Sequence, residues 1–381
     1  MKNIGKTAPD HSRRTLLKAA VGTGVILSAP YIRSAKAAPT ELTILAWYGL
    51  GEPDMVAEFE EANNVKFKPK YYAGGDNMLA TLAQSPAGSF DIIHTDAEYA
   101  RILIERGDLV DELDPSDYPF DDMTHEDFTR FPGHWKDGKL YSVICRFGHL
   151  GVAYNTDALT EQEAMSYNAF WSPSVQGKVG HFDWHLPTLG QISLLNGNTS
   201  SGPFDIDATA WQQVQEKTLS LKSQVNGFFD YGGTFASLKS GEILASVGIG
   251  DWVTAVVARD GGKVASVVPE EGGIQWTESY SIASSSTKKD LCKKYIQYCL
   301  SAEGQVKSAN MAAYPGFVVT KAGEEALIKM TPDEAKRTGQ MPGMANHPVK
   351  LIDDGRIHYR DTPKQQTLED WNDFWSEYKN A

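Results

Sequence analysis

The chain has few cysteines for its 381 residues: Cys145, Cys292 and Cys299. Cys292 and Cys299 are seven residues apart in a segment that the sequence predicts as a helix. Two helical turns separate them by about 10 Å, which is too far for a disulfide bond. None of the three cysteines has the spacing of a metal-binding motif. We therefore expect Cys292 and Cys299 to be buried apolar residues, and we expect no metal and no cofactor.

The sequence also lacks the short motifs of common enzyme classes. It contains no G-x-S-x-G element, no Walker sequence and no dinucleotide-binding glycine pattern. The Gly-Gly pairs at 71–77 (YYAGGDN) and 230–235 (DYGGTF) predict turns rather than phosphate-binding loops. His181 and His185 have the spacing of a helical zinc motif, but Pro187 follows closely and the segment predicts a strand and a turn. These residues therefore give little support to an enzyme.

Apolar runs of membrane-spanning length are absent beyond the N-terminus. Ser12–Lys18 forms a twin-arginine pattern, an apolar run follows at 19–30, and Ala35-Lys36-Ala37 is a small-x-small cleavage site. The alternative is an N-terminal membrane anchor, but the apolar run is short for a membrane span. We expect residues 1–37 to be a signal peptide for the twin-arginine (Tat) export machinery. The mature protein would then begin at Ala38 and lie in the periplasm.

Basic residues are scarce relative to acidic ones, with 36 Lys and Arg against 49 Asp and Glu. Removal of residues 1–37 takes away seven basic residues and one acidic residue, which leaves 29 against 48 and a net charge of −19. Such a surface repels nucleic acid and anionic lipid, so we expect no nucleic-acid partner. The charge is compatible with a cationic ligand, and it is equally compatible with a role in solubility alone.

Strands and helices alternate in the first part of the mature chain. The sequence predicts strands at 41–49, 65–71 and 90–96, each followed by an amphipathic helix. This order is typical of a parallel sheet covered by helices on both faces. Ligands of such sheets bind beyond the carboxyl ends of the strands, which here carry Trp47, Tyr48 and Asp96.

The rest of the chain continues the α/β pattern. A long run of β-forming residues at 139–159 predicts a strand that leaves one domain and enters another. Near the C-terminus, aromatic residues recur with helical spacing, which predicts core packing rather than a cofactor site. They are Trp371, Phe374, Trp375 and Tyr378.

The segment GGIQWTESYSIA (272–283) places Trp276 and Glu278 two residues apart after a Gly-Gly turn. In a strand, side chains two positions apart point to the same face. An indole ring and a carboxylate that share one space are a suitable seat for an organic cation. The segment therefore predicts one wall of a binding site.

Several stretches together resemble the periplasmic spermidine/putrescine-binding proteins, the solute receptors of ATP-driven polyamine importers. The most specific is E-G-G-I-x-W-x-[DE]-S at Glu271–Ser279. The others, beside the opening strand with Trp47, are MVAEFEEANNVKFK (55–68), FDIIHTDAEYARILIERGDLVDELD (90–114), YSVICRFGHLGVAYN (141–155), WSPSVQGKVGHFDW (171–184), VPEEGGIQWTESYSIA (268–283) and AYPG (313–316). The resemblance covers nearly all of the mature chain.

The resemblance implies an α/β fold of two lobes joined by hinge-crossing strands, which close on a ligand. It assigns 38–147 plus about 279–345 to one lobe, and 148–278 plus about 346–381 to the other. It implies that Trp276 stacks on the methylene chain of the ligand, that Glu278 holds an ammonium group, and that Trp47 is a second ring of the cage.

Other positions match the family less closely. Asp183 falls near the acidic pair that holds the second amine, and its companion position carries Trp184 or Pro187. Asp96 replaces a small hydroxyl side chain. Asp251 and Trp252 lie just beyond the position of a family tryptophan. Each of these acids could instead cap a helix, and each tryptophan could belong to the core.

Arg146 lies in the crossing strand, next to the expected cleft, although a polyamine offers no anionic group to it. It could bind a carboxylate or phosphonate, or it could pair with Asp96 or Asp183 between the lobes. We prefer the pairing.

These observations predict the solute-binding protein of an ABC importer, a periplasmic monomer that binds a polyamine or similar organic cation and docks on the membrane permease subunits. A second hypothesis keeps this role but gives it a zwitterionic or anionic ligand held by Arg146. A secreted enzyme is the third.

Overall fold

The computed structural model describes residues 38–381. The predicted signal peptide and its cleavage site at 1–37 therefore lie outside the described residues. Among residues 38–381, no helix combines the length and the apolar character that a membrane span requires.

The first sheet is built around β1 (Thr40–Ala46) and the strands that follow it, β2 (Val65–Tyr71) and β3 (Ile92–Asp96). Both neighbours pair with β1 in parallel, as the alternating pattern predicted. Between the strands run α1 (Pro53–Asn63) and α2 (Gly75–Gln84), and α3 (Ala97–Arg106) follows β3. Helix α1 begins at a proline, which fits the first helical turn, and ends before Asn64 in a left-handed conformation.

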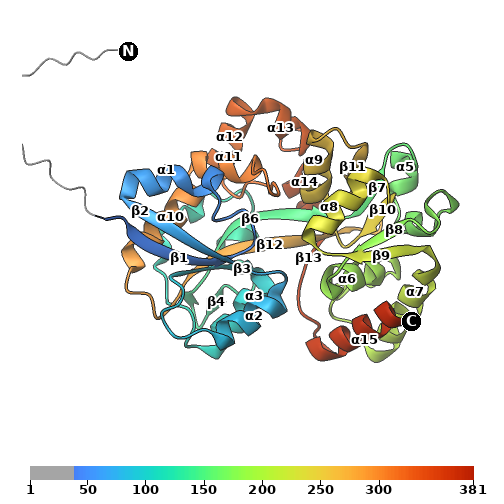
Figure 1. Ribbon diagram of the computed structural model, residues 1–381, viewed down its shortest axis with the longest axis horizontal. Helices are drawn as coiled ribbons and strands as arrows, with labels where there is room; N and C mark the ends of the chain where they lie inside the picture. The colour runs from blue at the N-terminus through green and yellow to red at the C-terminus, as the bar shows by residue number, and fades with distance from the viewer. Residues whose placement is uncertain (1–37) are drawn as a thin grey trace, which may run out of the picture. The chain divides into compact units, whose positions relative to one another are not determined.

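The first sheet continues with strands from later parts of the chain, in the order β13-β12-β3-β1-β2, with β6 paired to β12. Strand β12 (Gly273–Ile282) runs antiparallel to β3 and to β6 (Val143–Leu150), and β13 (Ile357–Tyr359) runs parallel to it. Figure 1 shows β6 and β12 lying side by side. We call this sheet and its helices the first lobe.

The second sheet has the order β11-β7-β10-β8-β9. Its strands are β7 (Val152–Asn155), β8 (Val179–Phe182), β9 (Val225–Phe229), β10 (Ala245–Val247) and β11 (Val264–Val267). Its helices are α6 (His185–Leu195), α7 (Ala208–Ser220), α8 (Tyr231–Ser240), α9 (Asp251–Arg259) and the C-terminal α15 (Leu368–Asn380). We call this sheet and its helices the second lobe.

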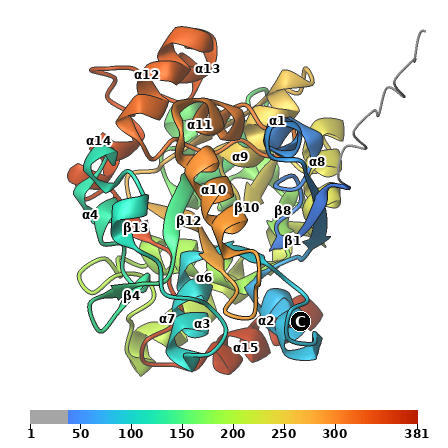
Figure 2. The same cartoon turned by 90° about the vertical axis from the view of Figure 1, so that its left-hand side faces the viewer.

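Further helices extend the first lobe. Helix α11 (Ala302–Ala309) packs against α1, α10 (Lys289–Leu300) and α12 (Lys321–Met330), and α13 (Pro332–Arg337) packs against α12 (Figure 2). The shorter elements are α4 (Glu126–Thr129), α5 (Glu161–Ala164), α14 (Pro348–Asp353), β4 (Trp135–Lys136), β5 (Lys139–Leu140) and the 3-10 turns η1 (Pro115–Asp117), η2 (Phe120–Asp122), η3 (Tyr167–Trp171), η4 (Pro173–Val175) and η5 (Lys222–Gln224).

The chain passes between the two sheets at closely packed points. Strand β6 continues into β7 through Gly151, where a Cβ atom would lie 2.0 Å from the carbonyl oxygen of Val267. At Gly250 a Cβ atom would lie 2.0 Å from the carbonyl oxygen of His149. The chain also crosses between β11 and β12 and between β13 and α15. The predicted α/β fold with crossing strands is confirmed.

The lobe boundaries proposed from the sequence remain a prediction. The observation that bears on them is which strands belong to which sheet. The first sheet extends through Leu150, begins again at Gly273 and includes β13.

Two local predictions are wrong. Tyr231–Gly233 forms the first turn of α8 rather than a Gly-Gly turn, because the Asp230 side chain caps the helix by accepting from the Gly233 amide at 2.7 Å. His185 begins α6, and Pro187 is accommodated there because the first amides of a helix need no helical partner.

The predicted core residues are buried. The aromatic stripe of α15 faces the second lobe, where Trp371 stacks on Trp211 with ring centroids 5.0 Å apart. Cys145, Cys292 and Cys299 are all buried free thiols. Burial raises the pKa of the Cys292 and Cys299 thiols to about 12, which keeps them protonated and unreactive. The interpretation of both residues as apolar core members is confirmed.

Candidate functional site

A cavity lies between the lobes, at the carboxyl ends of strands from both sheets. Its volume of about 40 Å³ has room for a few water molecules. Most of its wall is aromatic. The aromatic residues are Trp47, Phe182, Trp184, Tyr231, Trp252, Trp276 and Tyr314, and the others are Asp96, Leu150, Pro187, Gly248, Glu278 and Arg360.

Trp276 and Glu278 both line this cavity from β12, as expected for side chains two positions apart. In the neighbouring strand β6, Gly148 stands opposite Trp276. A Cβ atom at Gly148 would lie 2.3 Å from the indole ring, so the ring can occupy its position only because residue 148 has no side chain.

The Glu278 carboxylate has an internal cation beside it. Its Oε2 atom lies 3.2 Å from Arg146 Nε and 3.2 Å from His94 Nε2, and Tyr314 donates its hydroxyl to Oε1 at 3.4 Å. Burial is the largest single influence and opposes ionisation, but Arg146, His94 and Arg360 together outweigh it, so the pKa of Glu278 is lowered. Glu278 is therefore an ionised carboxylate.

Arg146 is buried, and its guanidinium group contacts a carbonyl oxygen, two aromatic rings and a carboxylate. Its Nη2 atom donates to the Tyr314 carbonyl at 2.8 Å, and its guanidinium lies 4.6 Å from the ring of Tyr314 and 5.3 Å from that of Trp276. The expected pairing with Asp96 or Asp183 is wrong, because the register of β6 and β12 places Arg146 opposite Glu278. Arg146 is thus the counter-ion of Glu278.

Asp96 forms a second internal ion pair. It accepts hydrogen bonds from Arg360 Nη2 and, at 3.0 Å, from Trp47 Nε1. Asp96 precedes α3 but makes no capping bond, so the capping alternative does not apply. Arg360 also donates to Glu98 Oε1 at 2.6 Å and lies 4.4 Å from the ring of Trp184. Burial raises the pKa of Asp96, and it raises the pKa of Glu98 to about 8.

The remaining predicted rings reach the cavity from both lobes. Trp47 and Trp184 approach each other with ring centroids 5.9 Å apart, and Trp252 stacks on Tyr231 at 5.9 Å with an angle of 20° between the planes. Sequence reasoning missed Tyr231, Tyr314, Phe182, Glu98 and Arg360. Phe182, Glu98 and Tyr314 lie in stretches that resemble the family, whereas Tyr231 and Arg360 do not.

Tyr48 and Asp183 were predicted to line the ligand space, but they lie outside it. Tyr48 is 47% exposed and packs edge-on against Tyr71. The Asp183 carboxylate accepts from Trp375 Nε1 at 2.9 Å and from Lys379 Nζ at 2.9 Å, so α15 draws it away from the cavity.

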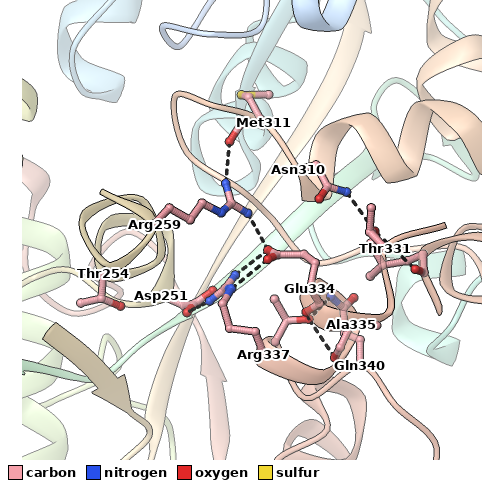
Figure 3. A network of polar contacts seen from close by, with 12 residues as sticks. Asp251, Thr254, Arg259, Asn310, Met311, Thr331, Glu334, Ala335, Arg337 and Gln340 are labelled. Carbon is pink, nitrogen blue, oxygen red and sulfur yellow. Dashed lines mark hydrogen bonds and ion pairs between the residues drawn. The ribbon is translucent and has the colours of Figure 1, made fainter. Parts of the chain in front are cut away.

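Asp251 is not among the residues that line the cavity. It belongs to an ionic network instead (Figure 3). Arg337 donates to Asp251 at 2.5 Å and to the largely buried Glu334 at 2.6 Å and 2.9 Å. Arg259 donates to Glu334 at 2.7 Å and to the Met311 carbonyl at 3.3 Å. Because Asp251 and Arg259 belong to α9 and the other two ions to α13, this network connects the two lobes.

Comparison with known proteins agrees with this architecture. The model of the family described as bacterial extracellular solute-binding protein matches residues 54–336. The spermidine/putrescine-binding periplasmic protein 1 of Haemophilus influenzae is 23% identical over 74% of this chain and 77% of its own length. The spermidine/putrescine-binding periplasmic protein of Escherichia coli is 23% identical over 71% and 75%.

A solved structure shares the fold. It is the spermidine/putrescine ABC transporter substrate-binding protein of Streptococcus pneumoniae, with a TM-score of 0.70 at 14% identity, covering 90% of this chain and 99% of that one. Since the family model spans most of the described residues, the chain belongs to the bacterial extracellular solute-binding protein family.

Proposed function

We propose that this protein is the periplasmic receptor of an ABC importer and that it binds a small organic amine, of the polyamine class or similar to it, in the cavity between the lobes. One observation carries the proposal: aromatic rings from both lobes surround the carboxylates of Glu278 and Asp96 in that cavity. Two relatives of this chain are named as spermidine/putrescine-binding proteins, which supports an amine as the ligand.

The chemistry of the wall suits a cationic group with an apolar body. An ammonium group is attracted to ring faces and forms strong hydrogen bonds to ionised carboxylates. Both features are needed, because a charge removed from water without partners is strongly destabilised. Trp47 belongs to the first lobe, and Trp184 and Trp252 belong to the second, so a ligand that contacts all three favours the closed arrangement of the lobes.

The proposal extends to the partners of the protein. The closed form would dock on the membrane permease subunits of the importer, and the protein would bind its solute without catalysis. Export through the Tat machinery, with cleavage after Ala37, is a separate part of the proposal that rests on 1–37 alone. N-terminal sequencing of the exported protein would test it.

Calorimetry tests whether the ligand is an amine. The protein is unfolded, dialysed and refolded to remove any bound solute, and then titrated with putrescine, spermidine and simple monoamines. Binding of at least one amine, with weaker binding to a Trp276→Ala variant, is the expected result. If only anions bind, or if the variant binds as tightly as the wild type, this assignment of the site is wrong.

A further inference from the structure

The charges around the cavity are already largely balanced. Among residues 38–381, the carboxylates in and behind its wall are those of Asp96, Glu98 and Glu278, and the guanidinium groups are those of Arg146 and Arg360. All five side chains are buried, with exposed fractions between 2% and 7%. At most one carboxylate is therefore left in excess.

A ligand with two ammonium groups does not match this balance. The first positive charge could be neutralised by the excess carboxylate, but the second would be buried beside Arg146 and Arg360 without a counter-ion. The remaining acceptor capacity of Glu278 is also partly used, because its Oε2 atom lies 3.2 Å from His94 Nε2. Burial raises the pKa of Glu98 to about 8, which acts in the same direction at neutral pH.

The internal cations also occupy part of the aromatic wall. Arg360 lies against Trp184, and Arg146 lies against Trp276 and Tyr314. The faces of Trp47, Trp252 and Tyr231 carry no such cation in the described part of the chain. The wall thus offers one region for an ammonium group rather than two.

Two buried hydrogen-bond donors of the wall lack a partner. The indole Nε1 atoms of Trp184 and Trp276 have no acceptor among the described residues, and both side chains are more than nine-tenths buried. A protonated polyamine has only donors to offer, so it would leave these groups unpaired. An oxygen acceptor on the ligand would satisfy such a donor.

From the charge balance and the unpaired indole groups, we infer that the ligand carries a single ammonium group together with an oxygen acceptor, such as a hydroxyl or carboxylate, and not the several ammonium groups of a polyamine. This inference rests on the proposed function, since it concerns the same cavity.

A series of amines with one four-carbon chain tests it by calorimetry on the refolded wild-type protein. The compounds are putrescine, butylamine, 4-aminobutan-1-ol and 4-aminobutanoate. We expect one of the two oxygen-bearing amines to bind at least about tenfold more tightly than both putrescine and butylamine, the effect of one well-formed buried hydrogen bond.

The other outcomes separate the two proposals. If putrescine binds at least as tightly as both oxygen-bearing compounds, the inference is overturned and the proposed function stands. If butylamine equals them, the oxygen acceptor is overturned. If none of the four compounds and no polyamine binds, the proposed function fails, and the inference fails with it.

Discussion

Gly148 lies directly opposite Trp276 across β6 and β12, and the indole ring occupies the space that a side chain at residue 148 would fill. The substitution Gly148→Ala should push the ring out of its position, since overpacking of this kind costs about 1–3 kcal/mol. We expect ligand affinity to fall by about tenfold, as measured by calorimetry. Gly232→Ala is the matched control, because its new Cβ would come no closer than 4.0 Å to a neighbour. Equal affinities of the two variants would refute this account.

Replacement of the Glu278 carboxylate tests whether its negative charge contributes to ligand binding. In Glu278→Gln the shape is kept, but the ligand loses a charged acceptor and Arg146 loses its counter-ion. Amine affinity should fall by about tenfold or more. The control is Glu112→Gln, an exposed acid paired with Lys139. A titration that gives the same dissociation constant for Glu278→Gln and the wild type would remove Glu278 from the site.

Arg360→Met leaves Asp96 and Glu98 buried without a cation. Loss of one partner of a buried ion pair lowers the free energy of unfolding by about 3–5 kcal/mol. Because negative charge then exceeds positive charge at the cavity, the affinity for putrescine should rise relative to that for 4-aminobutan-1-ol. Urea denaturation and calorimetry measure the two effects, with the exposed Arg130→Met as control. An unchanged ratio of affinities would contradict the charge argument.

The network between α9 and α13 should contribute to stability. Arg337→Gln removes one of the two arginines that hold Glu334, and we expect unfolding to become easier by about 1–3 kcal/mol. Lys263→Gln breaks an exposed pair with Asp157 and should change stability by less than about 0.5 kcal/mol. Urea denaturation compares the two variants, and similar midpoints would show that the network contributes nothing beyond a surface pair.

The protein should lose stability in mild acid. Burial lowers the pKa of His134, His149, His181 and His185 to about 3. Their ordinary pKa is about 6.5, so below that pH the unfolded chain binds protons that the folded chain does not, and the free energy of unfolding falls as the pH falls. Each histidine can contribute roughly 2 kcal/mol by about pH 5. Glu98 and Asp96, whose pKa values are raised, act in the opposite direction, but they are two groups against four.

Urea denaturation at a series of pH values from about pH 7 to about pH 5 measures this loss. The His134→Leu variant lacks one of the four groups and should show a shallower pH dependence. If stability did not change over this range, the four imidazoles could not be buried in their neutral form.

What the sequence predicted followed local rules. Alternation along one strand was sufficient to place Trp276 and Glu278 together, and the order of strands and helices was sufficient for the parallel part of the first sheet. The ion pairs were not predictable in this way. Arg146 meets Glu278 only through the register of two strands far apart in the chain, and no local pattern specifies that register.

Arg360 and Asp251 illustrate the same limit. Arg360 reaches Asp96 from a segment 264 positions later in the chain, and nothing in its neighbourhood distinguishes it from a surface arginine. Asp251 was predicted to bind the ligand, but it begins helix α9 and its carboxylate pairs with Arg337 instead. The orientation of both side chains therefore depends on partners that are distant in the sequence.

The glycines at the crossing have a mechanical consequence. At Gly151 and Gly250 the backbone of one segment lies against that of the next with no side chain between them, and β6 enters β7 through a single residue. We expect such a joint to let the two lobes rotate about it while it prevents them from sliding past each other. Solute would therefore enter and leave through a rotation about this line, which opens the far rim widely while the residues beside the joint barely move.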